Sequence, residues 1–163
     1  MSLTTMEDVL DHDLKDLYSA EKQLIEALPK LSKAATSARL KRAIDTHLEV
    51  TKEQLKRVEE AGKAIGATVT GHTCEGMKGL IKEGDGLIKD NDKGEALDVA
   101  LIGAAQRVEH YEIAAYGTAV AHAEELGKKD VVKLLKKSLE EESMANEELT
   151  TIAEGDVNER AAA

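Results

Sequence analysis

Four long segments of the sequence place apolar residues at alternating spacings of three and four, the pattern of a helix that buries one face. We predict long helices over residues 5–33, 37–65, 95–126 and 128–154, and a shorter, glycine-interrupted helix over 75–89. In the first segment the repeating positions are Leu10, Leu14, Leu17, Glu21, Leu24 and Leu28. Because these segments take up most of the chain, the pattern predicts an all-α fold.

The composition supports this fold class. The 163 residues include no Phe or Trp, three Tyr and one Pro, and are rich in Ala, Leu, Glu and Lys. A β-sandwich or barrel normally draws on aromatic and β-branched residues and on frequent turn residues. The length suits one ordinary domain with a real core, so we expect residues 1–163 to form a single domain.

The connections between the predicted helices indicate how the bundle is threaded. Only a few residues separate the first long helix from the second, and the third from the fourth, so each pair should form an antiparallel hairpin. Residues 66–94, between the second and third long helices, are numerous enough to run the length of a bundle. One long crossover between two hairpins is typical of the ferritin-like four-helix bundle, which we therefore predict.

Capping residues mark several helix ends. Thr4 or Thr5 can cap the first helix, with Glu7 or Asp8 completing a capping box. Asp92 is the expected N-cap of the helix that begins near residue 95. The last five residues, 159–163, are expected to be frayed.

Charge and cysteine content narrow the possible partners and location. Thirty-two acidic and 22 basic residues give a net charge of −10, which argues against binding to nucleic acids or anionic membranes. A single Cys cannot form an intrachain disulfide, which suits a reducing compartment. No signal-peptide pattern opens the sequence, and the longest apolar run, residues 99–105, is too short to span a bilayer. We expect a cytoplasmic protein.

Each long helix carries polar residues within its apolar stripe, and Glu and His are rarely buried without a partner. Counted from the end of the bundle where the first helix begins, these residues fall within a height of about four residues, roughly 6 Å. They are Glu21, His47, Glu109, Glu112 and Glu142.

This layer has the chemistry of a metal site. No Lys or Arg occupies the stripes, so no internal salt bridge is expected, whereas two divalent cations would balance four carboxylates. Oxygen ligands with one imidazole suit iron or manganese, with zinc also possible, and Glu109 and Glu112 form an i, i+3 pair on one helix face. The alternatives are a purely structural polar layer, or side chains that face solvent.

Several stretches of the sequence resemble the YciE/YciF stress-response family of ferritin-like proteins. They are DLYSAEKQL, HLEVTKEQ, QRVEHYEIAAYGT and LEEES, and the resemblance extends over nearly the whole chain. It implies a ferritin-like fold, a di-metal centre, a homodimer and no settled enzymatic activity. By position, the five residues of the polar layer match the family's candidate ligands. The family usually has His-x-x-Glu on the second helix, but this chain has Val50, which implies that one metal position is weak or empty.

Four further residues are expected beside the ligands. Tyr18 and Tyr116 lie one turn from Glu21 and Glu112, Gln54 shares the helix face of His47, and Asn146 continues the stripe of the last helix. Tyr111 lies off its stripe and should be peripheral. His72 and Cys74 lack the second ligand pair that a structural zinc site needs.

Two functions follow from these expectations. The first is a stress-associated metal-binding protein with two iron or manganese ions, or only one, that oxidises Fe(II) or reacts with O₂ or peroxide. If it is an enzyme, it would be a di-iron oxidoreductase. The second is a non-catalytic structural or interaction protein whose metal site is vestigial or half-occupied.

Overall fold

The computed structural model describes residues 3–163, and in this range the chain is helical with no strand. The all-α prediction is therefore confirmed. The helices are α1 (Met6–Ala34), α2 (Ala38–Ile65), α3 (Glu75–Asp90), α4 (Glu95–Glu125) and α5 (Lys129–Ile152), followed by a π-helical segment η1 (Ala153–Val157) and the short α6 (Asn158–Ala162).

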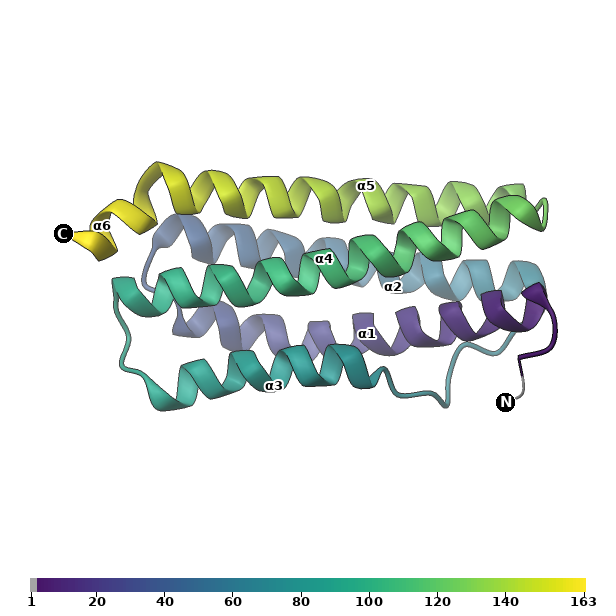
Figure 1. Cartoon of the computed structure of the whole chain (residues 1–163), viewed down its shortest axis with the longest axis horizontal. Coiled ribbons are helices and arrows are strands. Elements are labelled where there is room, and N and C mark those ends of the chain that lie inside the picture. The colour runs from purple at the N-terminus through teal and green to yellow at the C-terminus, as the bar shows by residue number, and fades with distance from the viewer. Residues whose placement is uncertain (1–2) are drawn as a thin grey trace.

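Figure 1 shows the four long helices lying side by side, with α1 antiparallel to α2 and α4 antiparallel to α5. The chain crosses between the two hairpins through α3, so α2 and α4 run in the same direction. Helix α5 packs on α2, α1 packs on α4, and α3 lies against α1 and α4. This arrangement brings the middle of all four long helices to the centre of the molecule.

The apolar core consists of two clusters at opposite ends of the bundle. One cluster contains residues such as Leu28, Leu40 and Leu101, and the other contains residues such as Leu14 and Leu135. Between the two clusters, each long helix contributes buried polar side chains. The helices therefore bury apolar side chains towards both ends and polar ones in a layer at mid-height.

The start of α1 follows the predicted capping box. The Thr5 hydroxyl accepts a hydrogen bond from the Asp8 amide (3.1 Å), and Oδ2 of Asp8 accepts one from the Thr5 amide (2.9 Å). The start of α4 differs from the prediction, because the N-cap is Gly94 and no side chain caps the helix. The assignment of Asp92 as the N-cap is therefore wrong.

The carboxyl end of the chain also differs from the prediction. Residues 158–162 form α6, so the expected fraying is wrong. The side chains of Ile152 and Val157 are fully buried, and Arg160 pairs with Asp156 at 3.1 Å. Buried apolar surface and this local ion pair keep the last turns of the chain helical.

Candidate metal centre

The five predicted ligands lie in the polar layer between the two apolar clusters. Glu21 comes from α1, His47 from α2, Glu109 and Glu112 from α4, and Glu142 from α5. Glu21, Glu112 and Glu142 have no exposed surface, and Glu109 is 3% exposed. Their burial shows that these residues do not face solvent, which was one of the alternatives left open by the sequence.

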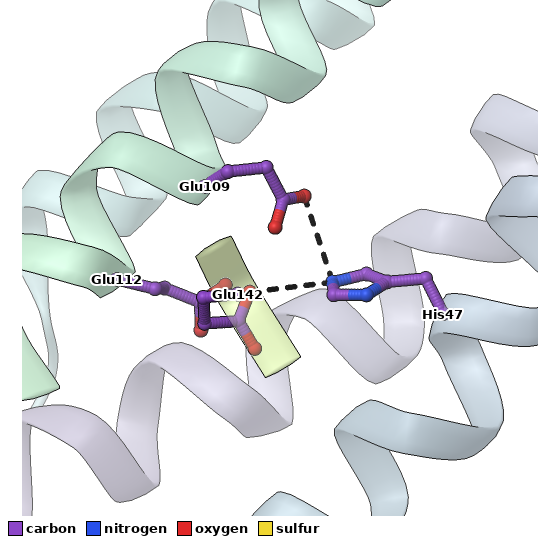
Figure 2. A group of neighbouring side chains, drawn as sticks. All are labelled: His47, Glu109, Glu112 and Glu142. Atoms are coloured by element: carbon purple, nitrogen blue, oxygen red, sulfur yellow. Dashed lines mark ion pairs between the residues drawn. The ribbon is translucent and has the colours of Figure 1, made fainter. Parts of the chain in front are cut away.

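Four of the five side chains converge on one point. Figure 2 shows His47, Glu109, Glu112 and Glu142 directed towards one another, and one potential ligand atom from each lies within 4.8 Å of the others. Nε2 of His47 is 3.5 Å from Oε1 of Glu109 and 3.7 Å from Oε2 of Glu142. These separations are too long for good hydrogen bonds.

Unpartnered polar atoms are concentrated in this layer. Within residues 3–163, every buried side-chain nitrogen or oxygen that lacks a hydrogen-bond partner belongs to it. The atoms are Oε2 of Glu21, Nε2 of His47, Oε1 of Gln54, Oε2 of Glu109, both carboxylate oxygens of Glu112 and Oε2 of Glu142. Leaving such groups buried without partners costs about 1–3 kcal/mol each, and more when they are charged.

The same crowding changes the acidity of the carboxyl groups. Burial, together with the negative charge of Glu142, raises the pKa of Glu21 and of Glu112 well above the ordinary value of 4.5. Burial and the neighbouring Glu142 also raise the pKa of Glu109. The protein alone therefore stabilises the neutral form of these groups, and a bound cation would stabilise the charged form.

These residues fit a divalent cation. Carboxylate oxygens and an imidazole nitrogen lie about 2.0–2.2 Å from a zinc ion, which is usually tetrahedral, so two ligand atoms on one such ion are about 3.5 Å apart. The candidate ligand atoms of the His47 group lie within 4.8 Å of one another, so a bound ion would draw the four side chains closer together. Three carboxylates and one imidazole form a donor set that suits iron, manganese or zinc.

Glu21 lies outside this group of four. Its Oε1 accepts a hydrogen bond from the Tyr116 hydroxyl, and both side chains are fully buried. Gln54 donates a hydrogen bond from Nε2 to Oε1 of Glu142. Tyr116 and Gln54 thus contact predicted ligands, as the sequence suggested.

Tyr18 and Asn146 make other contacts. The ammonium of Lys22 lies 5.7 Å from the centre of the Tyr18 ring, and Asn146 accepts a hydrogen bond from Gln106 at 3.2 Å. Within residues 3–163, neither side chain is hydrogen-bonded to a predicted ligand. Both are only partly buried, because they lie towards the edges of the inward helix faces.

The contacts of two residues around the layer, Arg57 and Tyr111, were not foreseen. Arg57 binds Glu141 through two hydrogen bonds of 2.7 and 2.8 Å. Tyr111, expected to be peripheral, is half-buried; its hydroxyl donates to Asp16 at 2.6 Å and lies 2.9 Å from Sγ of Cys74. The partners of Tyr111 are far away in the sequence, so helical spacing gave no signal for this contact.

None of the helices in the described part of the chain is long and apolar enough to cross a bilayer.

Comparisons with known proteins agree with the resemblance noted in the sequence. The chain is 44% identical over 162 residues to Protein YciF of Escherichia coli K12, covering 99% of this chain and 98% of that protein. The crystal structure of the E. coli stress protein YciF superposes with a TM-score of 0.92 and covers 96% of this chain and 99% of that one.

Two further solved structures are similar. YcfI of Rhodopseudomonas palustris has a TM-score of 0.90 at 44% identity, covering 93% of this chain and 97% of its own. A protein from Xanthomonas campestris has a TM-score of 0.76 at 21% identity, which shows a shared fold only; the match covers 98% of this chain and 100% of that one. Residues 5–162 match the family described as "Domain of unknown function (DUF892)", and the chain therefore belongs to this family.

Proposed function

We propose that this protein is a ferritin-like metal-binding protein whose central layer takes up Fe(II) or Mn(II). The observation that carries the proposal is the convergence of unpartnered, buried oxygen and nitrogen atoms on one point between α2, α4 and α5. Buried polar atoms without partners call for an explanation, and a bound ion that they coordinate supplies one.

The layer would offer two metal positions of unequal strength. His47, Glu109, Glu112 and Glu142 would hold the first ion. Glu21 would contribute to a second position, which would be weaker because Tyr116 already occupies one of its oxygens and because Val50 supplies no ligand. If the bound ions are iron, the chemistry that they would supply is the oxidation of Fe(II) by O₂ or peroxide.

The chain itself would fix the ligands and exclude water. Three of the five predicted ligands have no exposed surface, so bulk water does not compete at their oxygens. The hydrogen bond from Gln54 directs one oxygen of Glu142 and leaves the other facing His47. The Tyr116 hydroxyl donates a hydrogen bond to the Glu21 carboxylate in the same layer.

Metal stoichiometry tests this proposal. Protein purified without chelator from cells supplied with iron and manganese would be analysed by mass spectrometry, and metal-free protein would be titrated with Mn(II). We expect at least one equivalent in the wild type and loss of tight binding in Glu112→Gln. The control is Glu140→Gln, an exposed residue on α5. Failure of the wild type to bind either metal would refute the proposal.

Two observations favour a second candidate function, a non-catalytic structural protein with a half-occupied site. Tyr116 is hydrogen-bonded to Glu21, and Val50 supplies no ligand. The solved relatives are described as a stress protein in E. coli and as a candidate structural protein in R. palustris. One equivalent of metal without reaction towards O₂ or peroxide would support this function. Two equivalents with such a reaction would support the oxidoreductase.

The homodimer and the cytoplasmic location also remain proposals. Sedimentation of the purified protein measures the first, and fractionation of cells measures the second.

A further inference from the structure

Beside the polar layer lies a cavity of about 310 Å³ that is lined by residues from all four long helices. The room arises because small side chains, Ala43 on α2, Ala105 on α4 and Ala145 on α5, line the cavity where larger ones would fill it. This volume is about twice the 150 Å³ of an engineered apolar cavity that holds benzene. It lies at the lower end of the range for small-molecule sites.

The cavity is lined mostly by apolar side chains, with a few polar ones among them. Leu28, Ile44 and Leu149 are nearly fully buried and form part of the wall together with Val50. His47 and Glu109 also line the cavity. Nε2 of His47 and Oε2 of Glu109 have no hydrogen-bond partner, but they have almost no accessible surface and so lie behind the cavity wall, on the side of the polar layer.

Acidic side chains lie at the mouth of the cavity. Met144, which is 68% exposed, and the exposed Glu148 lie at its outer edge. Glu141 also lines the cavity, but its charge is balanced by Arg57 at 2.7 Å. Because the chain carries a net charge of −10, an anion would be repelled here, whereas a neutral molecule would not.

We propose that this cavity binds a neutral, mostly apolar organic molecule of about the size of two fused aromatic rings. The bound molecule would lie against the side chains of His47 and Glu109 on the α2–α5 side of the layer, which makes the cavity the substrate pocket of the proposed metal site. Only this last role rests on the proposed function; occupation of the cavity does not require a metal.

The first test uses metal-free protein and two fluorescent probes of matched shape. The probe 2-naphthol is uncharged at pH 7, whereas 2-naphthoate is an anion. We expect saturable binding of one 2-naphthol per chain, and binding of 2-naphthoate weaker by about tenfold or more. Absence of saturable 2-naphthol binding would overturn the proposal, as would equal binding of the two probes.

Cavity-filling variants locate the site. Ala145→Leu and Ala43→Leu place extra methyl groups in the cavity and should weaken 2-naphthol binding by about tenfold or more, equivalent to about 1.4 kcal/mol. The control is Ala114→Leu, an exposed position on α4 that does not line this cavity. It should bind the probe as the wild type does. Circular dichroism would verify that the variants unfold at similar temperatures, and having two filling variants keeps the test usable if one fails to fold.

Three outcomes separate this inference from the proposed function. If Mn(II) binds and speeds the nuclear relaxation of bound 2-naphthol protons, the ligand lies beside the metal and both proposals stand. If 2-naphthol binds but Mn(II) does not, the cavity is a ligand site and the metal proposal fails. If Ala145→Leu leaves probe binding unchanged, the cavity proposal is overturned. It is also overturned if Ala145→Leu dissociates a dimer in sedimentation, because the cavity is then a subunit interface.

Discussion

The side-chain amide of Gln54 on α2 donates a hydrogen bond to the carboxylate of Glu142 on α5, 88 residues later in the chain, and neither residue has exposed surface. The bond occupies Oε1 of Glu142, and Oε2 is the oxygen that lies 3.7 Å from Nε2 of His47. Gln54 therefore orients a predicted ligand while its own Oε1 has no partner.

This contact predicts that Gln54→Leu, which keeps much of the side-chain volume but removes the donor, weakens Mn(II) binding by about 10–100-fold. Without the bond, the Glu142 carboxylate is free to rotate away from His47. Titration of metal-free protein with Mn(II), followed by electron paramagnetic resonance, measures the change. Gln106→Leu is the control, because Gln106 bonds Asn146 and Thr150 rather than a predicted ligand. Equal affinities in the two variants would show that Gln54 does not position the ligand.

The raised pKa values of the buried carboxyl groups predict how the metal-free protein responds to pH. The pKa values of Glu21, Glu109 and Glu112 are above 4.5 in the folded state, so the folded chain holds protons that the unfolded chain has released. Their contribution to stability is therefore fully present below pH 4.5 and is lost as the pH rises through the folded values.

We accordingly expect the free energy of unfolding, measured in urea with chelator present, to be lower at pH 8 than at pH 5. Glu112→Gln removes one of the ionising groups, so it should reduce this difference and should stabilise the metal-free protein at pH 8 by about 1–3 kcal/mol. Glu140→Gln is the matched control on the exposed face of α5. A wild-type protein that becomes more stable between pH 5 and pH 8 would contradict the prediction.

Two glycines of α3 should respond oppositely to the same substitution. A Cβ at Gly76 would lie 2.8 Å from Cε2 of Tyr111, whereas a Cβ at Gly79 would meet nothing within 4 Å. Gly76→Ala should therefore destabilise the protein by about 1–3 kcal/mol, because the Tyr111 ring is held by Asp16 and Cys74. Gly79→Ala should stabilise it by about 0.5–1 kcal/mol through helix propensity. Urea unfolding of both variants would show whether α3 docks through Tyr111.

Much of this architecture could be predicted from the sequence, because helical periodicity determines which side chains share a face. Glu21 lies in register between Leu17 and Leu24, so burying those leucines also buries Glu21. The same reasoning identified the buried positions Glu109 and Glu112. Four independent stripes then placed the polar layer at one height, and the structure brings four of the five residues together.

Contacts between residues far apart in the chain could not be predicted in this way. Periodicity gives the face of a helix but not its neighbours, so neither the pairing of Arg57 with Glu141 nor the bonds of Tyr111 had a signal. Helix ends depend on such contacts too. Asp92 has the residue type of an N-cap, yet Gly94 is the N-cap of α4, which begins at Glu95.

The buried carboxylate of Asp98 in the first turn of α4 supplies the last prediction. It accepts hydrogen bonds from the Thr36 amide (2.7 Å), the Thr36 hydroxyl (2.6 Å) and the Ser37 amide (2.7 Å), so it ties the α1–α2 connection to α4. Asp98→Asn keeps the shape but turns an amide group towards these donors, and should destabilise the protein by about 2–3 kcal/mol in urea unfolding at pH 7. Asp92→Asn, an exposed residue that does not cap α4, should change stability by less than about 0.5 kcal/mol. If the two substitutions had equal effects, Asp98 would not anchor the α1–α2 connection to α4.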